Sequence, residues 1–290
     1  MSFNQNQNQN QNQVGSSGSS GVDLGFHSLV LDFTPLPFHP PFPLDELPTV
    51  LTSGWKFDDK LWDAGLLAVI GLREFAQLPW TAIDFPPTLP ERDEYLGWYV
   101  GPGRFDFIAA ELEKLRIMME NERDRYLPEI IAQADTALPY WFALLGITPG
   151  SKPKTIRLLM LALRIGEMAG MFWKHHYLRV RPSVLCPGLQ PPFGPPRHPS
   201  FPSNHSLQSW LVSLCLDSVT PQNSVHGSFY RPQLWWLAAR VAVNRERAGL
   251  HYPSDSKAGC YLAEELFKRT LNTVEFPTFL NALAAARLEW

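Results

Sequence analysis

Hydrophobic positions over 105–123 recur with the period of a helix. One stripe contains the residues Phe107, Ile108, Leu112, Leu115, Met118 and Met119. This spacing predicts an amphipathic helix that buries one face. Similar patterns predict a helix over 126–146 that is disturbed at Pro139, and a helix over 152–176 that begins at Pro153.

The C-terminal part of the chain continues this pattern. One helix is predicted to start at or near Ser203, a second to end at Gly249, and a third to begin with Pro253 and Ser254. One more helix closes the chain. Convincing alternation with a period of two, the signature of a half-buried strand, is absent. The predicted fold class is therefore all-α.

The N-terminal third of the chain has a different pattern. Residues 1–22 are polar and of low complexity, so we expect a disordered tail whose Gly/Ser part is typical of a linker. Residues 23–104 form a largely irregular, aromatic arm with short helical pieces, the clearest of which has Asp58 or Asp59 as a plausible cap. The remainder, 105–290, is predicted to be the helical core.

Composition narrows the class of protein. The chain has 290 residues, of which 45% are hydrophobic and 18% charged, as in ordinary globular proteins. A net charge of -3 argues against a nucleic-acid partner. We expect no transmembrane segment, because no apolar run reaches the roughly 18–20 residues that span a bilayer.

Other features of the sequence concern its compartment. The N-terminus lacks the basic region and apolar core of a secretory signal. The three cysteines include no CxxC pair, which favours free thiols in a reducing cytoplasm. We therefore expect a cytoplasmic protein. The oligomeric state stays open, a homo-oligomer included.

Polar residues gather in three segments at predicted helix ends. In "KHHYLRVRP", Lys174 and Arg181 are seven positions apart, about two helical turns, so they would share one side if the helix persisted. The segment "PSNH", Pro202 to His205, precedes an apolar helix, whose first amides could cradle an anion.

The third segment is "NRERAGLHYPSD". Arg245 lies near a helix end, His251 follows across a turn, and Asp255 opens the next helix. Asp255 is four residues after His251, close enough to accept a ring proton. The three segments together offer cations, a hydroxyl, amides, two histidines and a carboxylate, which suit a tetrahedral or trigonal-bipyramidal oxyanion. Because no carboxylate cluster is present to hold Mg²⁺, the positive charge must come from Lys and Arg.

These segments resemble the signature of the type 2 phosphatidic acid phosphatase / vanadium-dependent haloperoxidase superfamily. That signature reads KxxxxxxRP, PSGH and SRxxxxxHxxxD, and the chain matches its order and internal spacings over 174–255. Two positions depart from it, since Asn204 replaces the usual glycine and Asn244 the usual serine. If the amide of Asn204 is used in a left-handed conformation, Asn is the best substitute for glycine.

The resemblance implies a helical bundle of the acid phosphatase and vanadium haloperoxidase type, with 105–290 as its catalytic core. It also implies a role for each matching residue. His251 would be the nucleophile that forms a phosphohistidine, or the axial ligand of vanadate, and Asp255 would orient it. His205 would be the general acid, or the acid–base group that handles peroxide. The oxyanion would be bound by Lys174, Arg181, Arg245, Ser203 and the amide of Asn204.

The resemblance implies two functions, and the departures at Asn204 and Asn244 support a third. We favour a metal-independent phosphatase that hydrolyses phosphate monoesters without a cofactor. The alternative is a vanadium-dependent haloperoxidase, with vanadate as cofactor and halide and hydrogen peroxide as substrates. A less favoured hypothesis is a non-catalytic oxyanion-binding protein. His198, seven residues before His205, is either a pocket residue or a histidine that hydrogen-bonds a turn carbonyl.

Overall fold

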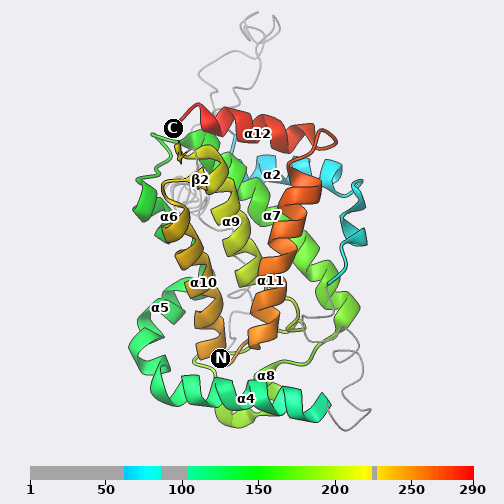
Figure 1. Ribbon diagram of the computed structural model, residues 1–290, viewed down its shortest axis with the longest axis vertical. Coiled ribbons are helices and arrows are strands. Elements are labelled where there is room, and N and C mark those ends of the chain that lie inside the picture. The colour runs from blue at the N-terminus through cyan, green and yellow to red at the C-terminus, as the bar shows by residue number, and fades with distance from the viewer. Residues whose placement is uncertain (1–61, 86–103, 224–226) are drawn as a thin grey trace, which may run out of the picture.

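The computed structural model describes residues 62–85, 104–223 and 227–290, and these residues form an all-α fold (Figure 1). The helices are α2 (Ala64–Phe75), α4 (Arg104–Asn121), α5 (Arg123–Asp135), α6 (Leu138–Leu145), α7 (Pro153–Tyr177), α8 (Pro182–Leu185), α9 (Asn204–Val219), α10 (Arg231–Arg247), α11 (Pro253–Leu266) and α12 (Pro277–Arg287). Short turns of other helix types are η5 (Pro79–Ala82), η6 (Pro187–Leu189) and η7 (Phe267–Leu271), the last a π-helix. Two-residue strands, β1 (Gln222–Asn223) and β2 (Gly227–Ser228), pair antiparallel. The predicted fold class is confirmed.

Helix α9 is the centre of the bundle. It packs against α7, α10 and α11, and its buried side chains include Leu207, Leu211 and Cys215. Helix α11 approaches α9 closely at Gly259, where a Cβ atom would lie 2.6 Å from the Ser203 carbonyl oxygen. Glycine therefore lets the start of α9 lie directly against α11.

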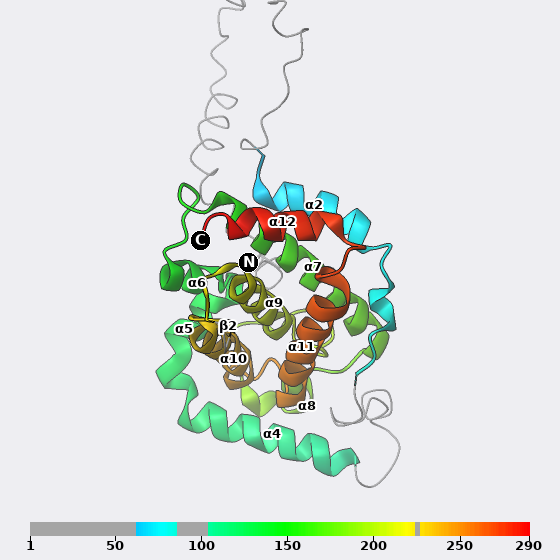
Figure 2. The ribbon, with the colours of Figure 1, turned by 45° about the horizontal axis from the view of Figure 1, so that its top comes forward.

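The two ends of the bundle are covered by different helices. Helices α2 and α12 lie across one end, and α4 crosses the other (Figures 1 and 2). The predicted apolar stripe of α4 buries Leu115 and Met118 with Leu189 and Tyr252. The end that α4 covers holds the first residues of α9 and α11 and the last residues of α10, which are the predicted site segments.

One detail of the predicted helices is wrong, and the condition under which Lys174 and Arg181 would share a helix face is not met. The segment 126–146 forms two helices, α5 and α6, because the chain breaks at Thr136 and Ala137, and Pro139 lies in the first turn of α6. The helix that holds Lys174 does not extend to Arg181, since α7 ends at Tyr177 and is followed by Leu178 with a φ of 51°. Lys174 and Arg181 therefore meet through a turn.

Much of the N-terminal arm lies outside the described residues, as do the predicted tail 1–22 and both Asp58 and Asp59. In the described part, α2 is capped by Asp63, whose carboxylate accepts a hydrogen bond from the Leu66 N–H at 3.0 Å. Helix α2 packs on α7 and α12. The division of the chain at residues 22 and 104 stays a prediction.

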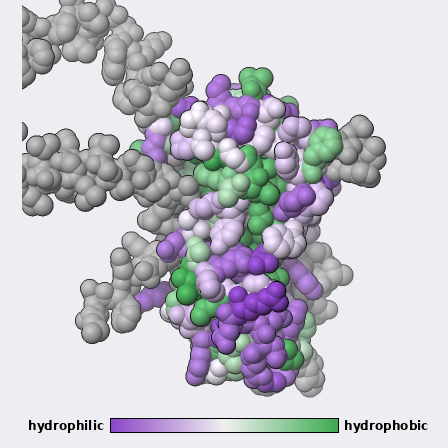
Figure 3. Space-filling view, turned by 90° about the vertical axis from the view of Figure 1, so that its left-hand side faces the viewer, coloured by the Kyte–Doolittle hydropathy of each residue, from purple (hydrophilic) through white to green (hydrophobic). Residues whose placement is uncertain are grey.

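The surface view shows hydrophilic residues over the lower part of one face, where Figure 1 places α4 and α5 (Figure 3). Ion pairs tie this region to α10: Glu129 binds Arg240 at 2.5 Å, and Glu122 binds Arg247 at 2.7 Å. None of the helices in the described ranges is long and apolar enough to span a membrane.

Candidate active site

Backbone signals place the site at helix ends. Ser203 is the N-cap of α9, with its hydroxyl oxygen facing the Ser206 N–H at 3.4 Å. After α10, Gly249 adopts a φ of 71° and turns the chain, so that His251 precedes Pro253 at the start of α11. The Ser203 N–H donates to the carbonyl oxygen of Asp255 at 3.0 Å, which joins the two helix starts.

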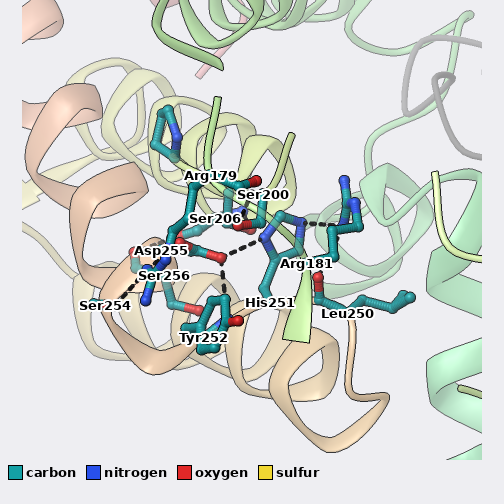
Figure 4. A network of polar contacts seen from close by, with 12 residues as sticks. Arg179, Arg181, Ser200, Ser206, Leu250, His251, Tyr252, Ser254, Asp255 and Ser256 are labelled. Atoms are coloured by element: carbon teal, nitrogen blue, oxygen red, sulfur yellow. Dashed lines mark hydrogen bonds and ion pairs between the residues drawn. The ribbon is translucent and has the colours of Figure 1, made fainter. Parts of the chain in front are cut away.

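His251 and Asp255 form a hydrogen-bonded pair. His251 Nδ1 lies 3.1 Å from Asp255 Oδ2, and the Tyr252 N–H donates to the same oxygen at 3.0 Å. On the other side of the ring, His251 Nε2 lies 3.4 Å from Nη1 of Arg181 (Figure 4). Since a carboxylate accepts and a guanidinium donates, these contacts favour the tautomer with its proton on Nδ1. Nε2 then carries the lone pair, which faces Arg181 over a long contact of 3.4 Å.

Burial and neighbouring charges set the protonation of this pair. Burial and the charge of Arg181 hold the pKa of His251 well below its ordinary value, although the hydrogen bond to Asp255 acts in the opposite direction. Burial would raise the pKa of Asp255, but the charge of Arg179 and the hydrogen bond from His251 outweigh it and keep this pKa low. Near neutral pH, His251 is therefore neutral and Asp255 ionised.

Arg181 is held by the loop before α9. Its Nε donates to the His198 carbonyl oxygen at 2.9 Å, and Nη1 donates to the Leu250 carbonyl oxygen at 2.8 Å. His198 Nδ1 lies 3.2 Å both from Arg181 Nη2 and from the Pro199 carbonyl oxygen. Burial and the charges of Lys174 and Arg181 lower the pKa of His198 to about 3, so its ring is neutral and can accept from Arg181. In one tautomer, Nδ1 can accept from Arg181 or donate to the Pro199 carbonyl oxygen but not both, so each hypothesis for His198 stays a prediction.

Lys174 is fully buried and surrounded by backbone oxygens. Its ammonium donates to the carbonyls of Pro199, Ser200 and Pro202 at 2.9, 2.8 and 2.5 Å. An ammonium has three protons, so all of its donors are engaged in holding this loop. Burial and the charge of Arg181 lower its pKa well below the ordinary value. Direct binding of an oxyanion by Lys174 would require it to exchange a carbonyl partner.

Asn204 opens α9, with an ordinary negative φ in place of the left-handed conformation considered for it. Its backbone N–H lies in the first turn, where a helix supplies no acceptor. The Asn204 side chain needs Gly170 of α7, since a Cβ atom there would lie 2.0 Å from Asn204 Oδ1. The departure from the signature at 204 is therefore accommodated by a glycine on a neighbouring helix.

His205 faces the last turn of α5. Its Nε2 lies 3.2 Å from the backbone oxygen of Gln133, one of the carbonyls that the helix end leaves without a partner. This contact favours a proton on Nε2. Burial and the charge of Arg245 hold the pKa of His205 well below its ordinary value. His205 is therefore neutral in the absence of an anion.

Arg245 has hydrogen-bond donors to spare. One guanidinium nitrogen, Nη2, donates to the Ile130 carbonyl oxygen at 2.6 Å. Nε and Nη1 are buried and have no hydrogen-bond partner among the described residues. Burial lowers the pKa of Arg245 only to about 10, so it remains charged at neutral pH. A buried cation with free donors can bind an anion strongly.

Several residues around the site were missed by the sequence analysis. Arg179 binds Asp255, Glu111 binds Arg179, and Gln133 binds Asn244 at 2.9 Å. Glu111 and Gln133 are polar residues at buried positions of amphipathic helices. A polar residue on the apolar face of a predicted helix could have indicated that each has a buried polar partner. Arg179 lies inside "KHHYLRVRP", but it has no counterpart in the signature, so the sequence analysis assigned it no role.

Other expectations concern metals and thiols. Cys186, Cys215 and Cys260 are free thiols, as expected, and Cys215 is buried in the core. Among the described residues, no group of three or more His, Cys, Asp or Glu side chains is arranged to hold a metal ion.

The fold and this geometry define a class of protein: a helical bundle in which two histidines and three buried cations meet at helix ends. Residues 155–275 match the family model of the PAP2 superfamily. This match confirms the inferred resemblance and indicates an enzyme of the phosphatase type. The matched range contains all three signature segments, whereas α4 and α5 precede it. No curated protein matches the chain.

Proposed function

We propose that the protein is a metal-independent phosphatase that hydrolyses phosphate monoesters through a phosphohistidine at His251. One observation carries the proposal: His251 Nδ1 is bound to Asp255, while Nε2 keeps its lone pair beside Arg181. A neutral imidazole oriented in this way is a competent nucleophile, because its partner carboxylate stabilises the positive charge that develops on attack.

In the first step, His251 Nε2 attacks phosphorus in line, a P–N bond forms, and the bond from phosphorus to the ester oxygen breaks. The free donors of Arg245 and the guanidinium of Arg181 stabilise the three non-bridging oxygens. Lys174 adds its charge and holds the loop that carries Ser203 and Asn204. The Asn204 amide, at the start of α9, is a further donor.

His205 moves the protons. In the site without substrate it is neutral, because burial and nearby cations lower its pKa. A bound phosphate dianion raises this pKa, so His205 can be protonated and can donate to the leaving alkoxide. In the second step it takes a proton from water, the water oxygen attacks phosphorus, and the P–N bond breaks to release inorganic phosphate.

Trapping of the intermediate tests the proposal. Enzyme mixed with a phosphate monoester labelled on phosphorus is quenched in alkaline denaturant, because phosphohistidine is labile to acid. We expect label on the peptide that contains His251, and none in His251→Ala. His175→Ala, which removes an exposed histidine at the end of α7, should retain the label. Normal turnover by His251→Ala would exclude the mechanism.

The haloperoxidase alternative uses the same residues. The lone pair of His251 Nε2 and the free donors of Arg245 also fit vanadate, which has the shape and charge of phosphate. His251 Nε2 would bind it, Arg181 and Arg245 would hold its oxygens, and Lys174 would add its charge. When bound, vanadate supplies the activation of hydrogen peroxide that halide oxidation needs.

A pair of assays separates the candidates. The purified protein is incubated with p-nitrophenyl phosphate and, separately, with vanadate, hydrogen peroxide and bromide or iodide. Phosphate release without halogenation supports the phosphatase. Halogenation without phosphate release replaces it with the haloperoxidase. Calorimetric binding of phosphate or vanadate without turnover in either assay identifies a non-catalytic oxyanion-binding protein.

A further inference from the structure

A buried charge network lies behind Asp255, on the side away from His251. Arg179 Nη1 donates to Asp255 Oδ1 at 2.6 Å and to the Ser254 hydroxyl oxygen at 2.7 Å. The Arg179 guanidinium also lies over the Tyr252 ring, 3.8 Å from its centroid. Arg179 is only 5% exposed and Asp255 is fully buried, so solvent screens this ion pair little.

Glu111 of α4 completes the network. Its Oε2 accepts from Arg179 Nη2 at 2.8 Å and from the Ser254 hydroxyl at 2.7 Å. Its Oε1 accepts from the Ser254 N–H at 2.7 Å, in the first turn of α11. One carboxylate thus fixes Arg179 and the start of the helix that presents Asp255. Glu111 lies outside the region matched to the superfamily.

The two oxygens of Asp255 therefore have separate partners. Oδ1 binds Arg179, while Oδ2 binds the His251 ring and the Tyr252 N–H. With Oδ1 held, rotation of the carboxylate would break a buried, charge-assisted hydrogen bond. Arg179 is a cation between two carboxylates, Glu111 and Asp255. The three side chains together therefore carry one net negative charge beside His251.

We propose that Arg179 is a positioning residue that fixes the Asp255 carboxylate for His251, and that Glu111 positions Arg179 in turn. The kinetic consequence rests on the function proposed above. A carboxylate held toward Nδ1 keeps the proton there and leaves the Nε2 lone pair for attack. Arg179 does not touch His251 Nε2, so it acts through Asp255.

A double-mutant cycle tests this with p-nitrophenyl phosphate as the substrate. We expect Arg179→Met to lower kcat at least tenfold with little change in KM, because Arg179 does not contact the substrate. In an Asp255→Asn background, the same substitution should lower kcat less than twofold. Arg179→Lys, which retains the charge, should recover part of the loss. Equal losses in both backgrounds, or a rise in KM that accounts for the loss, would overturn the proposal.

Removal of Arg179 alone leaves the buried carboxylates of Glu111 and Asp255 without their shared cation, so this variant can fail to fold. The double variant Glu111→Gln/Arg179→Met removes both charges together. It takes the place of Arg179→Met in the same cycle with Asp255→Asn, and the same results support or overturn the proposal. Arg231→Met is the matched control. It removes a different Arg–Asp pair, with Asp217, between the start of α10 and the end of α9, and should keep the kcat of the wild type.

Proton NMR gives a readout that does not need turnover. The His251 Nδ1–H, bound to a buried carboxylate, should give a low-field signal that His251→Ala and Asp255→Asn both abolish. Loss or displacement of the signal in Glu111→Gln/Arg179→Met, with retention in Arg231→Met, supports the positioning role even if the wild type hydrolyses no ester. An unchanged signal overturns it whatever the activity.

Discussion

The two histidines of the site stand in contrasting surroundings. On the α11 side, His251 is backed by Asp255, Arg179 and Glu111, and each charge has a partner at hydrogen-bond distance. On the α5 and α9 side, within the described part of the chain, His205 contacts a backbone carbonyl as its one hydrogen-bond partner, and two buried nitrogens of Arg245 have no partner.

This difference separates two tasks that one site must perform. A nucleophile gains from a fixed orientation, which a fully paired network supplies before the substrate arrives. Groups that receive an anion must keep donors free, and burial without a partner costs stability in the free protein. The α11 side is therefore built to be rigid, whereas the α5 side is completed by its ligand.

Removal of the free donors should have the largest effect. We expect Arg245→Met to lower kcat/KM by about 10²–10³-fold, the usual cost of one oxyanion donor. The same change should raise the free energy of unfolding by about 1–3 kcal/mol, since it removes unpaired buried donors. Activity assays and urea unfolding measure the two effects. A less stable variant would contradict the contrast between the two sides.

Arg240→Met is the matched control on the same helix. Arg240 forms a partly exposed ion pair with Glu129, so its loss should cost at most about 1 kcal/mol of stability. The rate should change little, and inorganic phosphate should still raise the melting temperature. Arg245→Met should lose this stabilisation by phosphate.

Acid should weaken the fold through the same residues. His198, His205 and His251 all have lowered pKa values in the folded protein. Their contribution to stability is therefore complete above the unfolded value of about 6.5 and is lost as the pH falls below it. Urea unfolding between pH 8 and pH 5 measures the decline, with the pH values chosen to bracket about 6.5.

His205→Asn should flatten this decline, because His205 has no carboxylate to raise its pKa, whereas His251 has Asp255. The comparison is made with the wild type in the same buffers. A decline of unchanged steepness in His205→Asn would show that the α5 side is not the source of the acid sensitivity.

The start of α9 offers a smaller steric test. In Gly170→Ala, the new Cβ atom would meet Asn204 Oδ1, and we expect a loss of about 1–3 kcal/mol in the free energy of unfolding. Asn204→Gly in the same chain should restore most of it. Gly150→Ala, where no atom lies within 4 Å of a new Cβ, is the control. Equal losses at both glycines would remove the role given to Gly170.

The smallest expected effect on the rate lies at Gln133. Gln133→Leu removes the Gln133 oxygen that accepts from the Asn244 side-chain amide, and we expect a cost of about 1–3 kcal/mol measured by urea unfolding. The kcat should change little, because His205 binds the backbone oxygen of Gln133, which the substitution retains. A loss of kcat as large as that of Arg245→Met would mean that the side chain acts in catalysis.

Helix periodicity predicted most of the fold, because burial of one face imposes a spacing that is local in sequence. The starts of α7, α9 and α11 followed from Pro153, Ser203 and Pro253, whose effects are also local. The break between α5 and α6 was expected at Pro139 but lies at Thr136 and Ala137, since the hydrophobic pattern over 126–146 continues through it. The N-cap of α2 is Asp63, whereas the sequence analysis proposed Asp58 or Asp59. Each of these aspartates precedes the hydrophobic pattern of the helix, so the pattern does not distinguish between them.

The sequence by itself determined the helical class and the three signature segments, because both depend on residue type at fixed spacings along the chain. The tertiary structure alone decided the partners of those residues. It engaged all three protons of Lys174 with backbone carbonyls, left donors free on Arg245, and placed Arg179 and Glu111 behind Asp255. Hydrogen bonds and buried charges depend on distance in space, and Glu111 lies 143 positions from Ser254, so no local pattern encodes their contact.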